Sequence, residues 1–167
     1  RLDLQMTKTT ISPFEQERVR KRYDGMARAY AATGQLITAH RHEATAALGV
    51  QPGERILDLA CGPGVNFKSI LKDLGTGGSL VGLDYSPRMI EQAQQLVKRN
   101  GWPNVTPLLG DAARSLFADC EFDRVLGTYS FSVIPGYQQA LDEVARVLKP
   151  GGTLVVLDGK SSNGPLR

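Results

Sequence analysis

The chain has 167 residues, the length of one domain at roughly 100–200 residues per domain. Hydrophobic residues make up 41% and charged residues 22%, a composition that excludes a disordered chain. No apolar run approaches the ~20 residues of a helical membrane span. The net charge of +3 is too small to indicate nucleic-acid binding, and the 2 cysteines, Cys61 and Cys120, cannot form a disulfide framework. We therefore expect a reduced, cytoplasmic protein with no nucleic-acid partner.

The first fifty residues predict two helices. Ser12-Pro13 is typical of a helix start, and a second helix is expected after Gly34, ending at Leu48. We interpret residues 1–49 as a helical cap on a second part, residues 50–167.

The first of these helices carries a cluster of cations at Arg18, Arg20, Lys21 and Arg22. Basic segments gain about 1 kcal/mol per residue at anionic membranes, so one hypothesis is peripheral membrane contact. The alternative is an ordinary solvated helix face, balanced by Glu15 and Glu17.

From residue 55 onward, predicted strands alternate with predicted helices. The strands are expected at 55–60, 80–84, 105–109, 122–127 and 153–157. Between them we expect a helix ending at 74, helices at 87–100 and 137–148, and a short helical piece at 112–117. This alternation predicts parallel βαβ units and an α/β fold. Pro107 is best tolerated on an edge strand, which favours a doubly wound, Rossmann-like sheet of order 3-2-1-4-5.

Ligands of such sheets bind outside the carboxyl ends of the strands, so the turns there carry the functional signals. After the first strand, Gly62 and Gly64 permit a sharp turn and close approach of a ligand. A dinucleotide-binding fingerprint would require a third glycine where this chain has Phe67. The first turn therefore argues against a nicotinamide cofactor.

The next two turns each carry an acid. Asp84 ends the second strand, twenty residues after Gly64, where a carboxylate can accept both hydroxyls of a ribose. Its alternative role is helix capping, which Ser86 can supply instead. Asp111 follows the third strand and is able to accept an adenine amine, although an acid there is also common in ordinary loops.

Five elements in this order resemble class I S-adenosylmethionine-dependent methyltransferases. They are Asp58-x-x-x-Gly62-x-Gly64, Asp84, Gly110-Asp111, Phe122-Asp123 and Leu148-Lys149-Pro150-Gly151-Gly152. The resemblance covers about residues 50–157 and implies S-adenosyl-L-methionine as the cofactor, with methyl transfer to a small molecule or lipid head group as the activity.

The resemblance also implies roles for individual positions. The methionine part would lie on the backbone of the first turn, which Asp58 orients, and Asp84 would take the ribose. Tyr85 and Met89 would flank adenine, and Asp111 and Ala112 would read its edge. The full set implied to bind the cofactor is Asp58, Ala60, Cys61, Gly62, Gly64, Asp84, Tyr85, Met89, Asp111, Ala112 and Thr128.

The sequence signals for the methyl acceptor are less specific than those for the cofactor. Residues 23–30 look like the Tyr-Asp element of quinone- and phospholipid-modifying methyltransferases, with Ala31 in place of its second aspartate. Residues 128–135 are similar to members that N-methylate lipid head groups. The substrate-side candidates are Tyr23, Tyr30, Tyr129 and Ser132. We find no metal-ligand pattern and no obvious general base, and expect surface or packing roles for His40 and His42.

Two other functions stay open at this point. One is an NAD(P)-dependent oxidoreductase on a similar sheet, and the other is a cofactor-binding protein without independent activity. Members of the resembled family usually continue past strand five with a helix and two more strands, whereas about ten residues follow Leu157 here. We therefore expect strands six and seven to be missing, either because the chain is a fragment or because a partner covers strand five.

Overall fold

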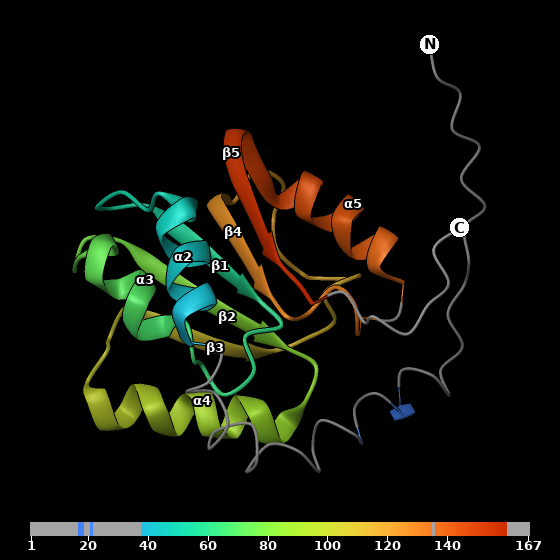
Figure 1. Cartoon of the computed structure of the whole chain (residues 1–167), viewed down its shortest axis with the longest axis horizontal. Coiled ribbons are helices and arrows are strands. Elements are labelled where there is room, and N and C mark those ends of the chain that lie inside the picture. Colours follow the sequence, from blue (N-terminus) through green and yellow to red (C-terminus); the bar gives the residue numbers. More distant parts are fainter. Residues whose placement is uncertain (1–16, 19–20, 22–37, 135, 160–167) are drawn as a thin grey trace.

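The computed structural model describes Glu17, Arg18, Lys21 and residues 38–134 and 136–159. The elements are α2 (Thr38–Leu48), β1 (Arg55–Leu59), α3 (Phe67–Leu74), β2 (Ser79–Asp84), α4 (Pro87–Asn100), β3 (Val105–Leu109), β4 (Phe122–Thr128), α5 (Tyr137–Val147) and β5 (Leu148–Leu157). The strands form a 5-stranded sheet of order β3-β2-β1-β4-β5, and every neighbouring pair is parallel (Figure 1). The predicted fold class and strand order are confirmed, including the edge position of the strand that contains Pro107.

Helices cover both faces of the sheet because alternate strand residues face opposite sides. Ile56, Leu80 and Leu126 pack on one face against apolar residues of α2, α3 and α4. Leu57 and Val125 pack on the other face against α5 and the connection between β3 and β4. The sheet is therefore a buried middle layer, and only its edges and strand ends remain for other contacts.

Phe67, the residue that breaks the dinucleotide fingerprint, is fully buried between two glycines. A Cβ atom on Gly82 would lie 2.6 Å from Cζ of the Phe67 ring and 2.9 Å from Sγ of Cys61. A Cβ atom on Gly64 would lie 2.7 Å from Cδ2 of the same ring. The ring thus fills the space above the middle of β2, and it locks the first turn against the sheet.

The helix signals in the sequence hold for α4. Ser86 caps it, since its Oγ accepts a hydrogen bond from Met89 N at 3.2 Å, and Pro87 is its first residue. Gly101 ends it in the left-handed conformation, with φ of 64°. Within the described part of the chain, no helix combines the length and the apolar character needed to cross a membrane.

The helix expected at 112–117 is wrong, because this segment consists of turns and irregular backbone. Side-chain contacts hold it in place of helical hydrogen bonds. Arg146 of α5 donates from Nη2 to the carbonyl of Phe117 at 2.8 Å, and Ser115 Oγ donates to Glu143 at 2.5 Å. A six-residue helix would be marginal by itself, so these contacts to α5 decide the conformation.

Strand five begins at Leu148, whereas the sequence predicted a start at Thr153 after a break at 150–152. Leu148 pairs with Phe122, and the next pair joins Thr153 to Arg124. Four residues of β5 therefore lie opposite the single residue Asp123 of β4 between these two pairs, and Gly151 takes φ of 79° within this irregularity. The Pro-Gly-Gly sequence makes a bulge inside the strand, not a loop before it.

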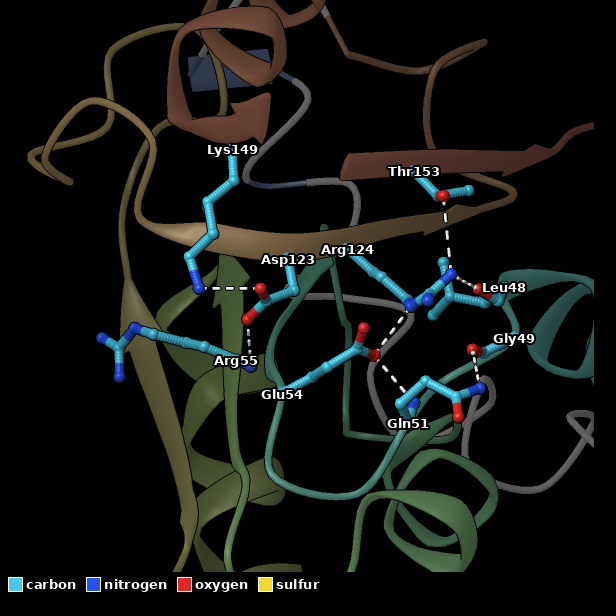
Figure 2. A network of polar contacts seen from close by, with 9 residues as sticks. All are labelled: Leu48, Gly49, Gln51, Glu54, Arg55, Asp123, Arg124, Lys149 and Thr153. Atoms are coloured by element: carbon cyan, nitrogen blue, oxygen red, sulfur yellow. Dashed lines mark hydrogen bonds and ion pairs between the residues drawn. The ribbon is translucent and has the colours of Figure 1, made fainter. Parts of the chain in front are cut away.

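A polar network ties the amino-terminal ends of the strands together, opposite the predicted ligand edge (Figure 2). Arg124 donates to Glu54 Oε2 and to the carbonyl of Leu48, both at 2.7 Å, and so joins the end of α2 to β4. Asp123 accepts from the backbone of Arg55 at 2.8 Å and from Lys149 Nζ at 2.7 Å. Partial burial raises the pKa of Asp123, but the two hydrogen bonds together with the charges of Lys149 and Arg124 outweigh it and hold the pKa below its usual range.

The packing of Phe67 predicts that Gly82→Ala destabilises the fold by about 1–3 kcal/mol, because the new methyl group would overpack the middle of β2. The matched control is Gly77→Ala, since no atom of the described residues would lie within 4 Å of a Cβ atom there. Denaturant unfolding of both variants measures the difference. Equal stabilities would show that the Phe67 ring can move aside freely.

Candidate cofactor site at the carboxyl ends of the strands

The carboxyl ends of β1, β2, β3 and β4 lie side by side along one edge of the sheet. Leu59 of β1 is in register with Leu83 of β2 and Gly127 of β4. Asp84, the last residue of β2, is in register with Leu109, the last residue of β3. The turns that follow these strands therefore share one edge, as ligand binding in this fold requires.

The turn after β1 folds back over the end of β2. Cys61 N donates to the carbonyl of Leu83 at 3.0 Å, and Gly62 N donates to Asp84 Oδ2 at 2.8 Å. Ala60, Gly62 and Gly64 have φ of 53°, 56° and 86°, so three left-handed residues produce the sharp bend. Among the residues that the structure describes, the only atom within 4 Å of a Cβ atom on Gly62 would be Met89 Sδ, at 4.0 Å. The backbone of Gly62 is thus open to the close approach of a ligand.

Asp84 is fixed in orientation by two backbone hydrogen bonds. Its Oδ2 accepts from Gly62 N, and its Oδ1 accepts from Ser86 N at 2.9 Å. An ionised carboxylate has two acceptor oxygens with two lone-pair directions each, the type of group that can accept from the two hydroxyls of a ribose. Because Ser86, not Asp84, caps α4, the helix-capping alternative for Asp84 loses its support.

Asp58 is the fully buried acid of β1, and it is the centre of a group that we call the Asp58 network: Arg41, Asp58, Asn66 and Thr128. Asn66 Nδ2 donates to both Asp58 oxygens, at 2.9 and 3.2 Å, and lies 3.0 Å from Thr128 Oγ1. Arg41 Nη1 donates to Thr128 Oγ1 and, at 3.2 Å, to Asn66 Oδ1. The network joins α2, β1, the residue before α3, and the end of β4.

Sequence reasoning missed two members of this network. Arg41 lies between His40 and His42 on α2, and nothing in its spacing marks it as buried. The residue is nevertheless only 8% exposed, and its Cζ lies over the Tyr129 ring, 5.0 Å from the ring centroid. Asn66 lies within the first turn, where its polar side chain close to Asp58 was the available signal. His40 is exposed, and His42 Nδ1 lies 3.1 Å from Ser69 Oγ.

Burial dominates the electrostatics of this site. Desolvation raises the pKa of Asp58 to about 7, opposed by the Asn66 hydrogen bond and the Arg41 charge and reinforced by the charge of Asp84. Burial likewise raises the pKa of the Cys61 thiol, with further contributions from Asp58 and Asp84. Cys61 is therefore a neutral, buried turn residue and has none of the thiolate character of a nucleophile.

The third turn lies next to the second. Gly110 N donates to the carbonyl of Asp84 at 2.9 Å, and Asp111 Oδ1 accepts from Ala113 N at 2.9 Å. Asp111 is half-buried and Ala112 is buried beside it. Asp111 thus has a defined orientation at the same edge as Asp84.

Two of the substrate-side candidates have contacts within the protein. Tyr129 has φ of 54°, and its N–H donates to the carbonyl of Leu157 at 2.6 Å. Ser132 Oγ donates to Asp158 Oδ1 at 2.8 Å, so β4 and β5 are linked beyond their ends. Tyr23 and Tyr30 lie outside the described residues.

The basic cluster of the first helix is only partly described. Arg20 and Arg22 lie outside the described residues, and Arg18 is exposed. Lys21 Nζ lies 3.7 Å from Glu17 Oε1, one turn earlier, so an acid balances this cation. Among the described residues no group of three or more His, Cys, Asp or Glu side chains could hold a metal ion.

The sequence profile of the methyltransferase-domain family matches residues 56–152, which include the turns after β1 to β4. The chain belongs to the class I S-adenosylmethionine-dependent methyltransferases. S-adenosylmethionine is the methyl donor of this family. The open backbone at Gly62, the oriented Asp84 and the neighbouring Asp111 fit such a donor.

Curated relatives of this chain include demethylmenaquinone methyltransferases. The protein from Geobacillus kaustophilus is 32% identical over 149 residues, which are 86% of this chain and 64% of that protein. The chain thus spans less than two thirds of the length of this relative.

Solved structures show the same fold. A methyltransferase in complex with the Trm112 activator of Haloferax volcanii has 29% identity and a TM-score of 0.73, covering 83% of this chain and 59% of that one. The (4+2) cyclase SpnF has 22% identity and a TM-score of 0.77, covering 89% of this chain and 61% of that one. Because its identity to this chain is only 22%, the similarity to SpnF shows a common fold and nothing more.

The buried acid of the Asp58 network predicts an unusual pH dependence of stability. An unfolded aspartate has a pKa of 3.8, and the folded one has a pKa of about 7. Between these values the native state binds more protons than the unfolded state, so Asp58 makes the protein less stable as the pH rises. Asp58→Asn removes this contribution.

Urea unfolding of the wild type and of Asp58→Asn at pH 5 and pH 8 measures the effect. The stability of the variant relative to the wild type should increase by on the order of 2–4 kcal/mol between these pH values. The comparison cancels the titration of groups that both proteins share, such as Asp123. A constant difference across this range would contradict a protonated Asp58.

Proposed function

We propose that this chain binds S-adenosylmethionine along the carboxyl edge of the sheet and takes part in methyl transfer to a small molecule such as a quinone. The observation that carries the proposal is the contact between the first turn and Asp84. The Gly62 N–H holds the carboxylate in place, and the Gly62 backbone is open beside it. In this proposal the acid that binds the ribose and the glycine turn that binds the amino-acid end of the donor are joined by this hydrogen bond.

Each part of the donor has a chemically suitable partner on this edge. Asp84 accepts the ribose hydroxyls, and Tyr85 and Met89 flank the adenine, with Asp111 and the backbone of Ala112 at its edge. Met89 is buried and Tyr85 is 39% exposed, so the pair offers one fixed and one adjustable apolar surface. The backbone of residues 60–64, and that of Thr128, hold the amino-acid end. Asp58 orients the turn through Asn66.

Positioning is the main catalytic contribution in this proposal. The bound sulfonium supplies an activated methyl group, and the protein supplies alignment, which contributes up to roughly 7–11 kcal/mol in well-oriented reactions. Among the described residues of this edge, Asp58 has a pKa near neutrality, but it is fully buried and bonded to Asn66. None of the other described residues of this edge has a raised pKa that suits it as an exposed base. An amine in its neutral form or an electron-rich ring carbon can attack the methyl group directly, and the proton that it loses after methylation then passes to solvent.

The quinone class is favoured by the demethylmenaquinone methyltransferases among the relatives. A lipid head group acceptor, and membrane contact through the cluster of Arg18, Arg20, Lys21 and Arg22, remain finer hypotheses. The Lys21–Glu17 pair supports the solvated-face alternative for that helix. The acceptor-side roles of Tyr23, Tyr30, Tyr129 and Ser132, and the division at residues 49 and 50, also remain predictions.

The two competing functions differ in their support. An NAD(P)-dependent oxidoreductase is disfavoured, because Phe67 fills the space that the third fingerprint glycine would leave free. A cofactor-binding protein without independent transfer activity is the second candidate. A cyclase shares this fold, and the chain spans 64% of a curated relative, so the fold alone does not determine the reaction.

Calorimetry tests the cofactor assignment. We expect the wild type to bind S-adenosylmethionine and S-adenosylhomocysteine but not NAD. Asp84→Ala should weaken both complexes at least tenfold, the effect of about 1.4 kcal/mol, because a charged hydrogen-bond acceptor contributes about that much or more. Asp142→Ala, on the exposed surface of α5, is the control and should bind normally. Tight binding of NAD alone would reject the proposal.

Transfer of a labelled methyl group tests the acceptor class. Demethylmenaquinone in its reduced quinol form, kept reduced by added dithionite, a phospholipid amine and a soluble amine are offered in parallel, with and without anionic vesicles. Labelling of the quinone alone is the expected result. Labelling of the phospholipid in a vesicle-dependent manner would instead favour the lipid hypothesis, and no labelling by a chain that binds the donor would favour the non-catalytic alternative.

A further inference from the structure

We propose that Arg41 is a positioning residue for methyl transfer, because it holds the turn after β4 in the conformation that aligns the acceptor with the donor. The inference rests on the proposed methyl transfer at this edge and names a further residue on which that transfer depends. In this proposal Arg41 does not touch the reacting atoms. It acts through Tyr129, the first residue beyond β4.

The side chain of Arg41 connects the beginning of α2 with the end of β4. Its Nη1 donates to Thr128 Oγ1 and, at 3.2 Å, to Asn66 Oδ1. Its Cζ lies over the Tyr129 ring, 5.0 Å from the ring centroid. Because Arg41 is buried, solvent competes little with these contacts. A planar guanidinium can donate within its plane and cover an aromatic ring with its face, which an ammonium group cannot do.

The backbone of Tyr129 has a conformation that needs support from its surroundings. Its φ of 54° is left-handed, which is unfavourable for a bulky side chain. Thr128 is the last residue of β4 that pairs with β5, so Tyr129 lies beyond the ladder. Its N–H donates to the carbonyl of Leu157 at 2.6 Å, and its ring lies under Arg41. Strained residues persist where neighbouring groups hold them, and they cluster at functional sites.

The order of the strands indicates which turn lies next to the acceptor. In the proposed complex the ribose lies at Asp84 and the adenine at Asp111, beside the ends of β2 and β3. The amino-acid end of the donor lies at the turn after β1, and the reactive sulfonium joins this end to the ribose. The next strand of the sheet is β4. Since the nucleoside occupies the β2 and β3 side of the edge, the side of β4 and Tyr129 is left for the acceptor.

Loss of the Arg41 contacts should therefore affect the acceptor more than the donor. Thr128 keeps its place in the sheet through pairing with β5. Asn66 still donates to both oxygens of Asp58 and so keeps the first turn oriented. Tyr129 lies beyond the last strand pair, so the turn after β4 should change most. A displacement of about 1 Å is enough to reduce the rate of an aligned reaction about 10²-fold.

Kinetics of Arg41→Lys test the inference. The acceptor is the compound that the wild type methylates, which is demethylmenaquinol in the expected case. We expect kcat/KM for the acceptor to fall about tenfold or more, while the calorimetric dissociation constant of S-adenosylmethionine changes less than about threefold. Tyr129→Leu should show the same split. Tyr129→Phe keeps the ring beneath the guanidinium and should retain transfer.

Arg124→Lys is the matched control, because Arg124 joins the same two elements at the opposite end of the sheet. It belongs to β4 and donates to the carbonyl of Leu48, the last residue of α2 (Figure 2). Urea unfolding of both lysine variants measures the stability that each loses. A purely structural role of Arg41 predicts the same kinetics for both variants once the folded fraction is taken into account. We expect Arg124→Lys to lose stability and keep the wild-type kcat/KM.

Two further measurements separate the Tyr129 contact from the other contacts of Arg41. In a double-mutant cycle, Arg41→Lys combined with Tyr129→Leu should lose no more kcat/KM than either single variant. Hydrogen exchange of the Tyr129 amide, which donates to Leu157, should be about tenfold faster or more in Arg41→Lys than in Arg124→Lys. This exchange is independent of catalysis. If Arg41→Lys does not fold, Tyr129→Leu tests the same contact from its other side.

The outcomes are distinct. Wild-type kinetics in Arg41→Lys, equal losses in Arg41→Lys and Arg124→Lys, or independent losses in the cycle would overturn the inference while leaving the proposed function intact. A donor affinity that falls as far as kcat/KM would assign Arg41 to the donor and would also overturn it. Failure of the wild type to methylate any acceptor would overturn the methyl transfer of the proposed function and this inference together.

Discussion

One side-chain amide holds the cofactor edge of this domain together. Asn66 Nδ2 reaches the buried carboxylate of β1 and the hydroxyl of β4, and its carbonyl oxygen accepts from Arg41. A buried carboxylate without such partners would be severely destabilising, so the three segments must meet here for the chain to fold. The hydrogen bonds that the buried Asp58 requires therefore fix the start of α3, the end of β4 and the position of α2. The orientation of the glycine turn follows, because Asn66 is its last residue.

The two ends of the sheet use polar groups for different purposes. At the amino ends, Asp123 and Glu54 are paired with cations and exposed in part, and the pKa of Asp123 is lowered by hydrogen bonds. At the carboxyl ends, Asp58 is fully buried and its pKa is raised. The first arrangement is that of ordinary stabilising pairs. The second gives Asp58 a pKa near 7 at the edge where we propose that a ligand binds. Strongly shifted pKa values of this kind are typical of functional sites.

The sequence predicted the parts of this structure that local signals determine. β3 was predicted at its observed bounds, α4 was predicted from its cap and its final glycine, and the position of Pro107 placed β3 at the edge. Features that depend on distant partners were not predictable. The segment after Asp111 follows contacts with Arg146, and the burial of Arg41 follows a contact with Thr128, 87 residues away. No local periodicity encodes either contact.

The charge of Asp58 is difficult to explain by stability alone. An asparagine or an apolar residue at that position would avoid the desolvation that raises the pKa to about 7, and replacing buried ionic groups in this way is often neutral or stabilising. The charge of Asp84 raises the pKa of Asp58 further, whereas the Asn66 hydrogen bond and the charge of Arg41 lower it. An arrangement that lowers stability as the pH rises is retained where a ligand makes use of it. The proposed role of Asp58 in the donor site is one such use, since Asp58 orients the glycine turn through Asn66.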